Sequence, residues 1–296
     1  MGSQGTLGIV TQVKLKTAPY NPQTSLLAGF FDNIDKAADA VDEMQKLGPS
    51  CMEMVDDHLL DFVSKHNPSQ LKGIIEKPYP KIAVLIEFDD MNDRTQKSKA
   101  RRAKKILAEM AYEYRLTRDT HEQQSLWKLR HSAAAVLWHT AGNSKALPII
   151  EDGVVPKEGF TEYLNRVYAL YQKHGLDVAV WGHAGDANLH MQPFLDLSKV
   201  GDRQKVFRIA DEYYNMVLEM GGSTSGEHND ARMRAPYLPR VYGKEMYELF
   251  RKVKKIFDPM NTMNPGVKID VDRADLVPML RREYSMKHLY DHLPKS

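Results

Sequence analysis

The sequence predicts an α+β domain, built on an antiparallel sheet with helices on one face. Short apolar runs of strand length alternate with longer segments whose apolar residues recur at helical spacing. The order strand, helix, strand, strand occurs twice, first from Ser25 and again from about Leu147. Because this order is typical of ferredoxin-like arrangements, we expect a duplicated ferredoxin-like domain.

Each element follows from its local pattern. Residues 25–31 form an apolar run that predicts a strand, and the helical spacing that begins at Ile34 ends at Gly48. The amphipathic stretch 242–257 predicts a helix that packs through one side. The remaining predicted elements are strands at 51–55, 82–88, Val178 and Leu189, and helices over about 95–112 and around 160–174.

The composition is that of an ordinary globular protein. Hydrophobic residues make up 42% of the 296 residues, and the formal net charge is +2. The single cysteine, Cys51, excludes an internal disulfide and any iron–sulfur cluster held by several cysteines of this chain. We therefore expect a reducing, cytoplasmic location, with peripheral association at the inner membrane left open.

The densest run of basic residues lies at 97–105 and permits two interpretations. It could contact nucleic acid or an anionic membrane, or it could be the solvated face of a helix. Ala100, Ala103 and Ile106 keep an apolar stripe through the run, and no aromatic residues interleave with the bases. We therefore expect a solvated helix face and no nucleic-acid partner.

Two stretches of the second half contain the chemistry-bearing residues. Residues 181–190 read Trp-Gly-His-Ala-Gly-Asp-Ala-Asn-Leu-His, and residues 221–228 read Gly-Gly-Ser-Thr-Ser-Gly-Glu-His. Apolar flanks predict strand, turn and strand around the first, which brings His183 near His190, while Glu227 and His228 follow on a glycine loop. Two imidazoles and a carboxylate suit a divalent metal. Spacing alone leaves two interpretations open, a metal site or unrelated surface and core histidines.

Four motifs in one order resemble the C-terminal half of FAD-linked oxidases of the vanillyl-alcohol oxidase superfamily. Besides the two stretches above, these are residues 2–11, Gly-Ser-Gln-Gly-Thr-Leu-Gly-Ile-Val-Thr, and the pair Phe-Asp-Pro at 257–259 and Asn-Pro-Gly at 264–266. The nearest resemblance is to the D-lactate, D-2-hydroxyglutarate and glycolate dehydrogenase group. Residues 147–156 are similar to bacterial members that are fused to iron–sulfur domains.

The resemblance implies a role for individual residues. It implies that His183, His190 and Glu227 bind a divalent metal, zinc being the first choice and iron or manganese alternatives, and that His228 is the catalytic base. The implied substrate-binding residues are Arg130, Lys145 and Asn188. The implied FAD contacts are Gly2, Gly5, Thr6, Gly8, Ile9 and Asn264.

The implied reaction is the FAD-dependent oxidation of a small D-2-hydroxy acid. A metal that holds the substrate hydroxyl lowers its pKa, so that a nearby imidazole can take the proton while the α-hydrogen leaves as hydride to the flavin. The planar fork of Arg130 suits the substrate carboxylate. The chain departs from the family at Ala187 and at Asn229-Asp230-Ala231, where glycines are common, and these changes bear on loop shape.

The resemblance also divides the chain. Residues 1–20 correspond to the last segment of an FAD-binding domain, 21–235 to a substrate-binding cap domain, and 236–296 to a helical segment that returns to the FAD domain. Since most of the flavin half is not in this sequence, we expect a separate FAD-binding domain or subunit as a partner, with an iron–sulfur domain or subunit as another. The sequence would then be a domain of a longer chain, a truncated reading frame or one part of a split enzyme. The alternative is a non-catalytic metal- or ligand-binding domain left after loss of the flavin half.

Overall fold

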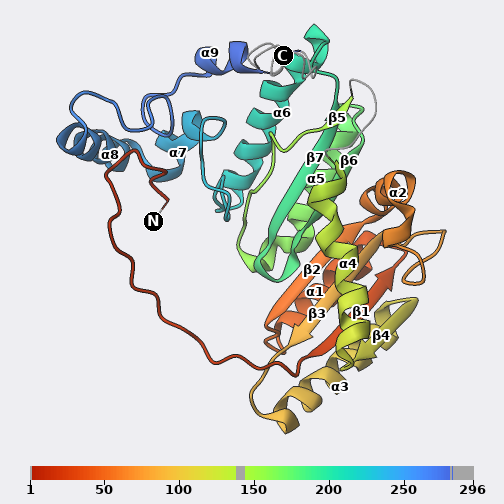
Figure 1. Ribbon diagram of the computed structural model, residues 1–296. Helices are drawn as coiled ribbons and strands as arrows, with labels where there is room; N and C mark the ends of the chain where they lie inside the picture. Colours follow the sequence, from red (N-terminus) through yellow and green to blue (C-terminus); the bar gives the residue numbers. More distant parts are fainter. Residues whose placement is uncertain (1, 138–143, 281, 283–296) are drawn as a thin grey trace, which may run out of the picture.

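A single antiparallel sheet organises the computed structural model, which describes residues 2–137, 144–280 and 282. Its strand order is β4-β1-β3-β2-β6-β7-β5, and each neighbouring pair is antiparallel. The strands are β1 (Ser25–Phe31), β2 (Cys51–Asp56), β3 (Ile82–Phe88), β4 (Glu113–Thr117), β5 (Lys145–Ala146), β6 (Val178–His183) and β7 (Asn188–Leu195). Figure 1 shows these strands as one continuous layer.

Helices connect the strands and continue beyond the sheet. Within the described residues they are α1 (Ile34–Gln45), α2 (Asp57–His66), α3 (Asp93–Met110), α4 (Thr120–Leu137), α5 (Phe160–Lys173), α6 (Val200–Glu219), α7 (Leu238–Tyr242), α8 (Lys244–Phe257) and α9 (Arg273–Leu276). Asparagine and aspartate side chains accept backbone N–H groups at the first turns of α1, α2 and α3, which satisfies donors that have no partner within the helix.

The sheet consists of two similar units joined edge to edge. In the first unit the order β4-β1-β3-β2, with α1 and α3 as its connections, is the ferredoxin-like order. The second unit repeats it through β5, α5, β6, β7 and α6, without a fourth strand in the described residues. Strands β2 and β6 meet at the junction, where Met54 pairs with Gly182 and Val55 with Trp181. The predicted fold class is confirmed.

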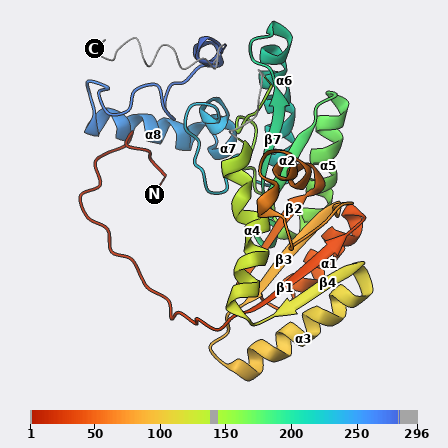
Figure 2. The ribbon, with the colours of Figure 1, turned by 45° about the vertical axis from the view of Figure 1, so that its right-hand side comes forward.

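Helices cover both faces of this sheet. The core on one face includes residues of α1, α3, α5 and α6, as the sequence predicts. On the other face α2 and α4 contribute a second core, so the helices are not confined to one face as the sequence predicted. Figure 2 shows α4 on one side of the strands and α1 and α5 on the other. All seven residues of β1 are buried, and a strand that is apolar on both faces requires cover on both.

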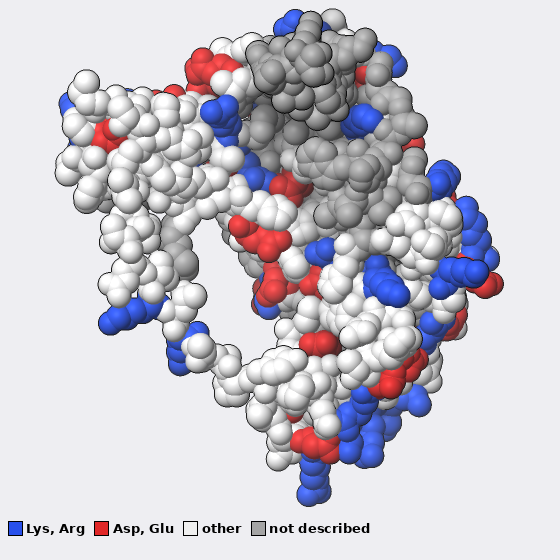
Figure 3. All heavy atoms as spheres, viewed as in Figure 1, with Lys and Arg blue, Asp and Glu red and all other residues white. Residues whose placement is uncertain are grey.

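The basic run at 97–105 lies on α3. Ala100, Ala103 and Leu107 are buried against the sheet, so the helix packs through the apolar stripe and the predicted solvated basic face is confirmed. Figure 3 shows basic side chains at the lower end of the molecule, where α3 lies in Figure 1. Five basic residues of the run are exposed, namely Lys97, Arg101, Arg102, Lys104 and Lys105.

The C-terminal helices and the N-terminal segment lie beyond the end of the sheet. Helix α8 and its following loop are near residues 2–8, and an irregular, exposed segment then leads back to β1 (Figure 1). The predicted domain boundaries at 20 and 235 stay predictions. No helix in the described parts of the chain is long and apolar enough to cross a bilayer.

Candidate metal and substrate site

The β6–β7 hairpin places two histidines at its mouth. Trp181 pairs with His190 and His183 with Asn188, so both histidine side chains project from the same face. Their ring centroids are 5.3 Å apart, which confirms the predicted proximity. A short 3-10 turn at Ala184–Asp186 closes the hairpin, and Ala187 takes the left-handed conformation (φ 51°) that glycine adopts more readily.

The glycine loop after α6, residues 221–228, is hydrogen-bonded to Asp152 in the segment that precedes α5. The side chain of Asp152 is fully buried and accepts three hydrogen bonds from this loop, from the N–H of Glu227 (3.1 Å), the N–H of His228 (2.9 Å) and the hydroxyl of Ser225 (2.7 Å). A Cβ at Gly226 would lie 2.3 Å from Asn188 Nδ2, so only glycine permits this approach. Asp152 therefore holds Glu227 and His228 at the hairpin mouth.

Three imidazoles converge on one carboxylate oxygen. The Nε2 atoms of His183 and His190 lie 3.1 Å from Glu227 Oε1, and that of His228 lies 3.2 Å from it. The ligand atoms of His183, His190 and Glu227 all lie within 4.8 Å of one another. The structure thus brings together the predicted ligand set and the predicted base. We call these four residues the histidine centre.

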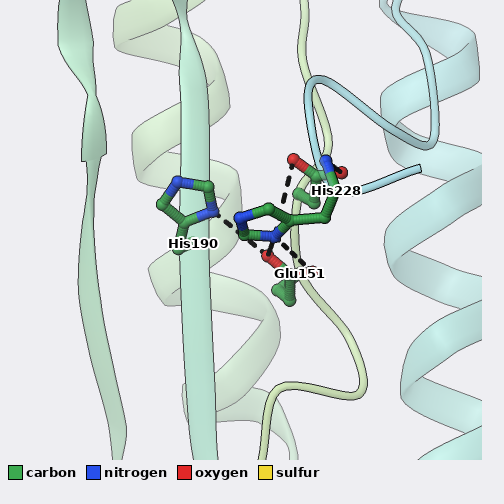
Figure 4. A group of neighbouring side chains, drawn as sticks. Glu151, His190 and His228 are labelled. Carbon is green, nitrogen blue, oxygen red and sulfur yellow. Dashed lines mark hydrogen bonds and ion pairs between the residues drawn. The ribbon is translucent and has the colours of Figure 1, made fainter. Parts of the chain in front are cut away.

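Buried glutamates hold the opposite nitrogen of each ring. His183 Nδ1 lies 2.6 Å from Glu53 Oε1, while the Nδ1 atoms of His190 and His228 lie 3.1 and 3.0 Å from Glu151 Oε2. Figure 4 shows Glu151 beside the last two rings, which stack on each other with centroids 4.7 Å apart. Because Nδ1–H donates to a carboxylate, a neutral ring turns its Nε2 lone pair toward Glu227.

Each of these glutamates is also paired with an arginine. Arg130 Nε donates to Glu53 Oε2 at 2.6 Å, and Arg234 Nη2 donates to Glu151 Oε1 and, at 3.1 Å, to its backbone oxygen. Burial alone would raise the pKa of Glu151, but hydrogen bonds from the two histidines and the Arg234 charge lower it to about 2. The same balance lowers the pKa of Glu53. Both glutamates are therefore ionised and accept from the rings.

The carboxylates in turn act on the histidines. The hydrogen bond to Glu53 raises the pKa of His183, and the hydrogen bond to Glu151 raises the pKa of His228. The carboxylates around the histidine centre therefore favour a positive charge within it. A proton on each of these rings is one way to supply that charge, and a cation is another.

The predicted substrate-binding residues take different positions. Arg130 reaches the histidine centre through Glu53, whereas Lys145 begins the edge strand β5 and pairs with Leu195. Asn188 is buried, and its amide nitrogen donates to Asp152 Oδ1 (3.3 Å) and to the carbonyl of Gly153 (3.1 Å). Asn188 thus stabilises the segment that contains Asp152 and Gly153. The substrate-binding roles of Arg130, Lys145 and Asn188 stay predictions.

The two predicted flavin segments lie together beside the histidine centre. Asn264 Nδ2 donates to the carbonyl of Gln4 at 2.6 Å, and Gln4 Oε1 accepts the N–H of Ala231 at 2.8 Å. Residues 230–234, Gln4 and Asn264 contribute to the lining of a hollow of about 410 Å³. Asn229 and Ala231 have φ values of 69° and 46°, so this loop keeps the left-handed turns that glycines usually provide.

The predicted FAD contacts of residues 2–9 differ in exposure. Thr6 is buried and bonds to the carbonyl of Ser3, whereas Ile9 is 80% exposed. Gly2, Gly5 and Gly8 have positive φ values, which explains glycine at these positions. Their contact with FAD stays a prediction.

Sequence reasoning missed the residues behind the ligands. These are Glu53, Glu151, Asp152 and Arg234. An acid in the middle of an apolar strand, as in Met52-Glu53-Met54, was a usable signal because a buried charge requires a partner. The adjacent acids of Glu151-Asp152-Gly153 were a second signal.

The fold and the histidine centre define an α+β domain with a cluster of imidazoles and carboxylates at one end of its central hairpin. The family of C-terminal domains of FAD linked oxidases matches residues 21–267, and the chain belongs to this family. This result confirms the resemblance that the four motifs indicated.

Named relatives agree with the family. The chain is 28% identical over 272 residues to the glycolate oxidase subunit GlcD of Bacillus subtilis, covering 90% of this chain and 55% of the relative. It is 28% identical over 303 residues to the D-2-hydroxyglutarate dehydrogenase of Escherichia coli, covering 98% of this chain and 29% of that protein. With the D-lactate dehydrogenase of Archaeoglobus fulgidus the identity is 26%, over 90% of this chain and 56% of the relative. The chain therefore spans about half the length of the glycolate oxidase subunit and of the D-lactate dehydrogenase, and less than a third of the D-2-hydroxyglutarate dehydrogenase.

Solved structures support the fold. The 4-ethylphenol oxidase from Gulosibacter chungangensis matches with a TM-score of 0.62 at 13% identity, covering 87% of this chain and 55% of that one. A p-cresol methylhydroxylase matches with a TM-score of 0.60 at 12% identity, covering 85% and 54%.

Proposed function

We propose that this chain is the substrate-binding part of an FAD-dependent dehydrogenase that oxidises a small D-2-hydroxy acid, such as D-lactate or glycolate. The relatives that share its family are named for glycolate, D-lactate and D-2-hydroxyglutarate. Because the chain covers only part of each relative, their activities support the proposal without transferring directly.

The convergence of three Nε2 atoms on Glu227 is the observation that carries the proposal. With Nδ1–H directed to Glu53 or Glu151, neutral rings present lone pairs to an anionic oxygen at 3.1–3.2 Å. The lone pairs of these Nε2 atoms and of the carboxylate oxygen repel one another, so this arrangement requires a positive charge between them. Two imidazoles and a carboxylate are a suitable donor set for zinc, and also for manganese or iron. We therefore assign His183, His190 and Glu227 as ligands of one divalent metal.

His228 is the proposed base. Its side chain is 50% exposed, against 30% for His183 and 5% for His190, so it is the ring that a substrate reaches most easily. Glu151 fixes its Nδ1 and leaves Nε2 to accept the proton of a hydroxyl. A neighbouring dication disfavours the imidazolium and keeps this ring in its accepting form.

A 2-hydroxy acid presents a carboxylate next to its hydroxyl. We assign the carboxylate to Arg130, with Lys145 as a second basic residue, because a guanidinium binds two carboxylate oxygens side by side. When bound, the divalent metal polarises the substrate hydroxyl, and FAD accepts the two electrons of the oxidation. The protein's own contribution is to orient the substrate, to hold the ligands and to take the proton at His228.

We infer that an FAD-binding domain or subunit packs against α8 and the segments around it. Several apolar side chains there are exposed to solvent, namely Met246, Leu249, Ile256, Phe257 and Met260. An exposed apolar patch of this kind is typical of an interface. An iron–sulfur domain or subunit is the proposed route for the electrons, and association with the inner membrane is part of the same proposal.

The test is the metal content of the purified chain and of three variants. We expect near-stoichiometric zinc or manganese in the wild type, loss of the metal in His190→Ala and retention in His228→Ala. His174→Ala is the matched control, because His174 also pairs with an acid, Glu212, but lies away from the centre. A metal-free wild type after dialysis against zinc and manganese contradicts the proposed site, and metal loss in His228→Ala makes that residue a ligand instead of the base.

A further inference from the structure

Glu53 connects two parts of the proposed site that lie on different elements. Its side chain, 7% exposed, projects from the middle of β2, with His183 of β6 at one oxygen and Arg130 of α4 at the other, each at 2.6 Å. Burial of a carboxylate between two such partners costs free energy unless both contacts form. The two contacts of Glu53 therefore fix the ring plane of His183 and the Nε edge of the Arg130 guanidinium together.

We propose that Glu53 is a positioning residue that couples the metal ligand His183 to the substrate-anchoring Arg130, so that an altered Arg130 weakens metal binding at a distance. This inference rests on the proposed function, because it assigns a metal to His183 and a carboxylate to Arg130. Arg130 itself contacts Glu53, and the coupling is transmitted through that carboxylate.

The pattern on the other side of the centre supports this reading. Glu151 stands between Arg234 and two rings in the way that Glu53 stands between Arg130 and one. Each arginine bonds one carboxylate oxygen of its glutamate, and the other oxygen accepts Nδ1–H, once at Glu53 and twice at Glu151. Histidine ligands whose second nitrogen is held by a carboxylate are oriented and made more basic, and loss of that partner weakens metal binding by about 10–100-fold.

Zinc titration of the metal-free chain by calorimetry tests the coupling through Glu53→Gln, Arg130→Lys and the double variant. An amide has one acceptor oxygen, so Glu53→Gln keeps the shape but cannot accept from both partners. We expect its zinc affinity to fall about 10–100-fold. Arg130→Lys keeps the charge but loses the guanidinium geometry, and we expect a fall of about 2–10-fold. Added to Glu53→Gln, it should have no further effect.

Glu87→Gln is the matched control. Glu87 projects from β3 on the same face as Glu53, since Cys51 pairs with Glu87 and Glu53 with Leu85, and it carries the same charge. Its zinc affinity should equal that of the wild type. Thermal melting of the metal-free proteins checks folding, and if Glu53→Gln does not fold, Arg130→Lys against the wild type carries the test.

Each outcome is assigned to one claim. A wild type that binds no zinc overturns the proposed metal site itself. A wild type that binds zinc, with Glu53→Gln binding equally well, overturns the present inference and leaves the site standing. Losses for Glu53→Gln and Arg130→Lys that add in the double variant overturn the coupling.

Discussion

Two clusters of histidine and carboxylate in the described chain are built in opposite ways. The histidine centre lies at the mouth of the β6–β7 hairpin. The second cluster, Asp56, Asp57 and His58, lies where β2 ends and α2 begins, and its ligand atoms are also within 4.8 Å of one another. By proximity alone, both clusters qualify as metal sites.

The lone pairs of the second cluster are already used. Asp56 is fully buried and accepts the N–H of Leu59 (2.8 Å), the N–H of Val180 (3.0 Å) and the hydroxyl of Tyr168 (3.1 Å), so it caps α2 and ties it to β6 and α5. Lys81 bonds to Asp57. The Asp56–Asp57–His58 cluster is therefore structural.

In the histidine centre the carboxylates behind the rings accept Nδ1–H, and the remaining lone pairs meet at Glu227. What distinguishes a candidate site is thus the set of donor atoms left facing a common point after the fold has used the others. Variants in the two clusters test this distinction.

The largest expected difference is in turnover. In the enzyme assembled with its FAD-binding domain, His228→Ala should lower kcat by about 10²–10⁴-fold, the range for loss of a general base. His58→Ala should leave kcat unchanged, because its ring lies away from Glu227. Steady-state rates with D-lactate and with glycolate measure both. Equal losses in the two variants contradict the distinction, and a fully active His228→Ala removes this residue as the base.

The next difference separates stability from metal binding. Asp152→Asn and Asp56→Asn each remove one acceptor from a buried, multiply bonded carboxylate, so both should lower the free energy of unfolding by about 1–3 kcal/mol. Only Asp152→Asn should also weaken zinc binding, because Asp152 holds the backbone of Glu227 and His228. Urea unfolding of metal-free protein and zinc titration measure the two effects. Wild-type zinc affinity in Asp152→Asn would show that the loop keeps its shape without this carboxylate.

The sequence predicted the local half of this architecture. The observed β1 and β3 have the predicted bounds because each is a mainly apolar run that is followed by a polar residue. The approach of His183 to His190 was predictable for the same reason, since strand alternation and a short turn fix the geometry of a hairpin.

The contacts behind the ligands were not predictable, because they depend on strand order. Glu53 meets His183 only because β2 and β6 are neighbours at the junction of the two units, 130 residues apart in the chain. No local pattern determines which edge strands of the two units pair with each other. Likewise, nothing near Arg234 in the sequence indicates that it pairs with Glu151, 83 residues earlier.

The smallest expected difference is in the pH dependence of stability. Asp56 and Asp57 raise the pKa of His58 from 6.5 to about 10, since both favour its charged form. A pKa raised in the folded state contributes stability that is full below pH 6.5 and is lost as the pH rises toward 10. The free energy of unfolding of metal-free wild type should therefore fall more between pH 6 and pH 10 than that of His58→Gln. The subtraction cancels other groups that titrate in this range, including His183 and His228, because both proteins contain them. The effect should be small, because the His58 side chain is 45% exposed and solvent screens its charge. Parallel curves for the two proteins would show that His58 contributes nothing to stability through its charge, and that the cluster acts through the Asp56 cap alone.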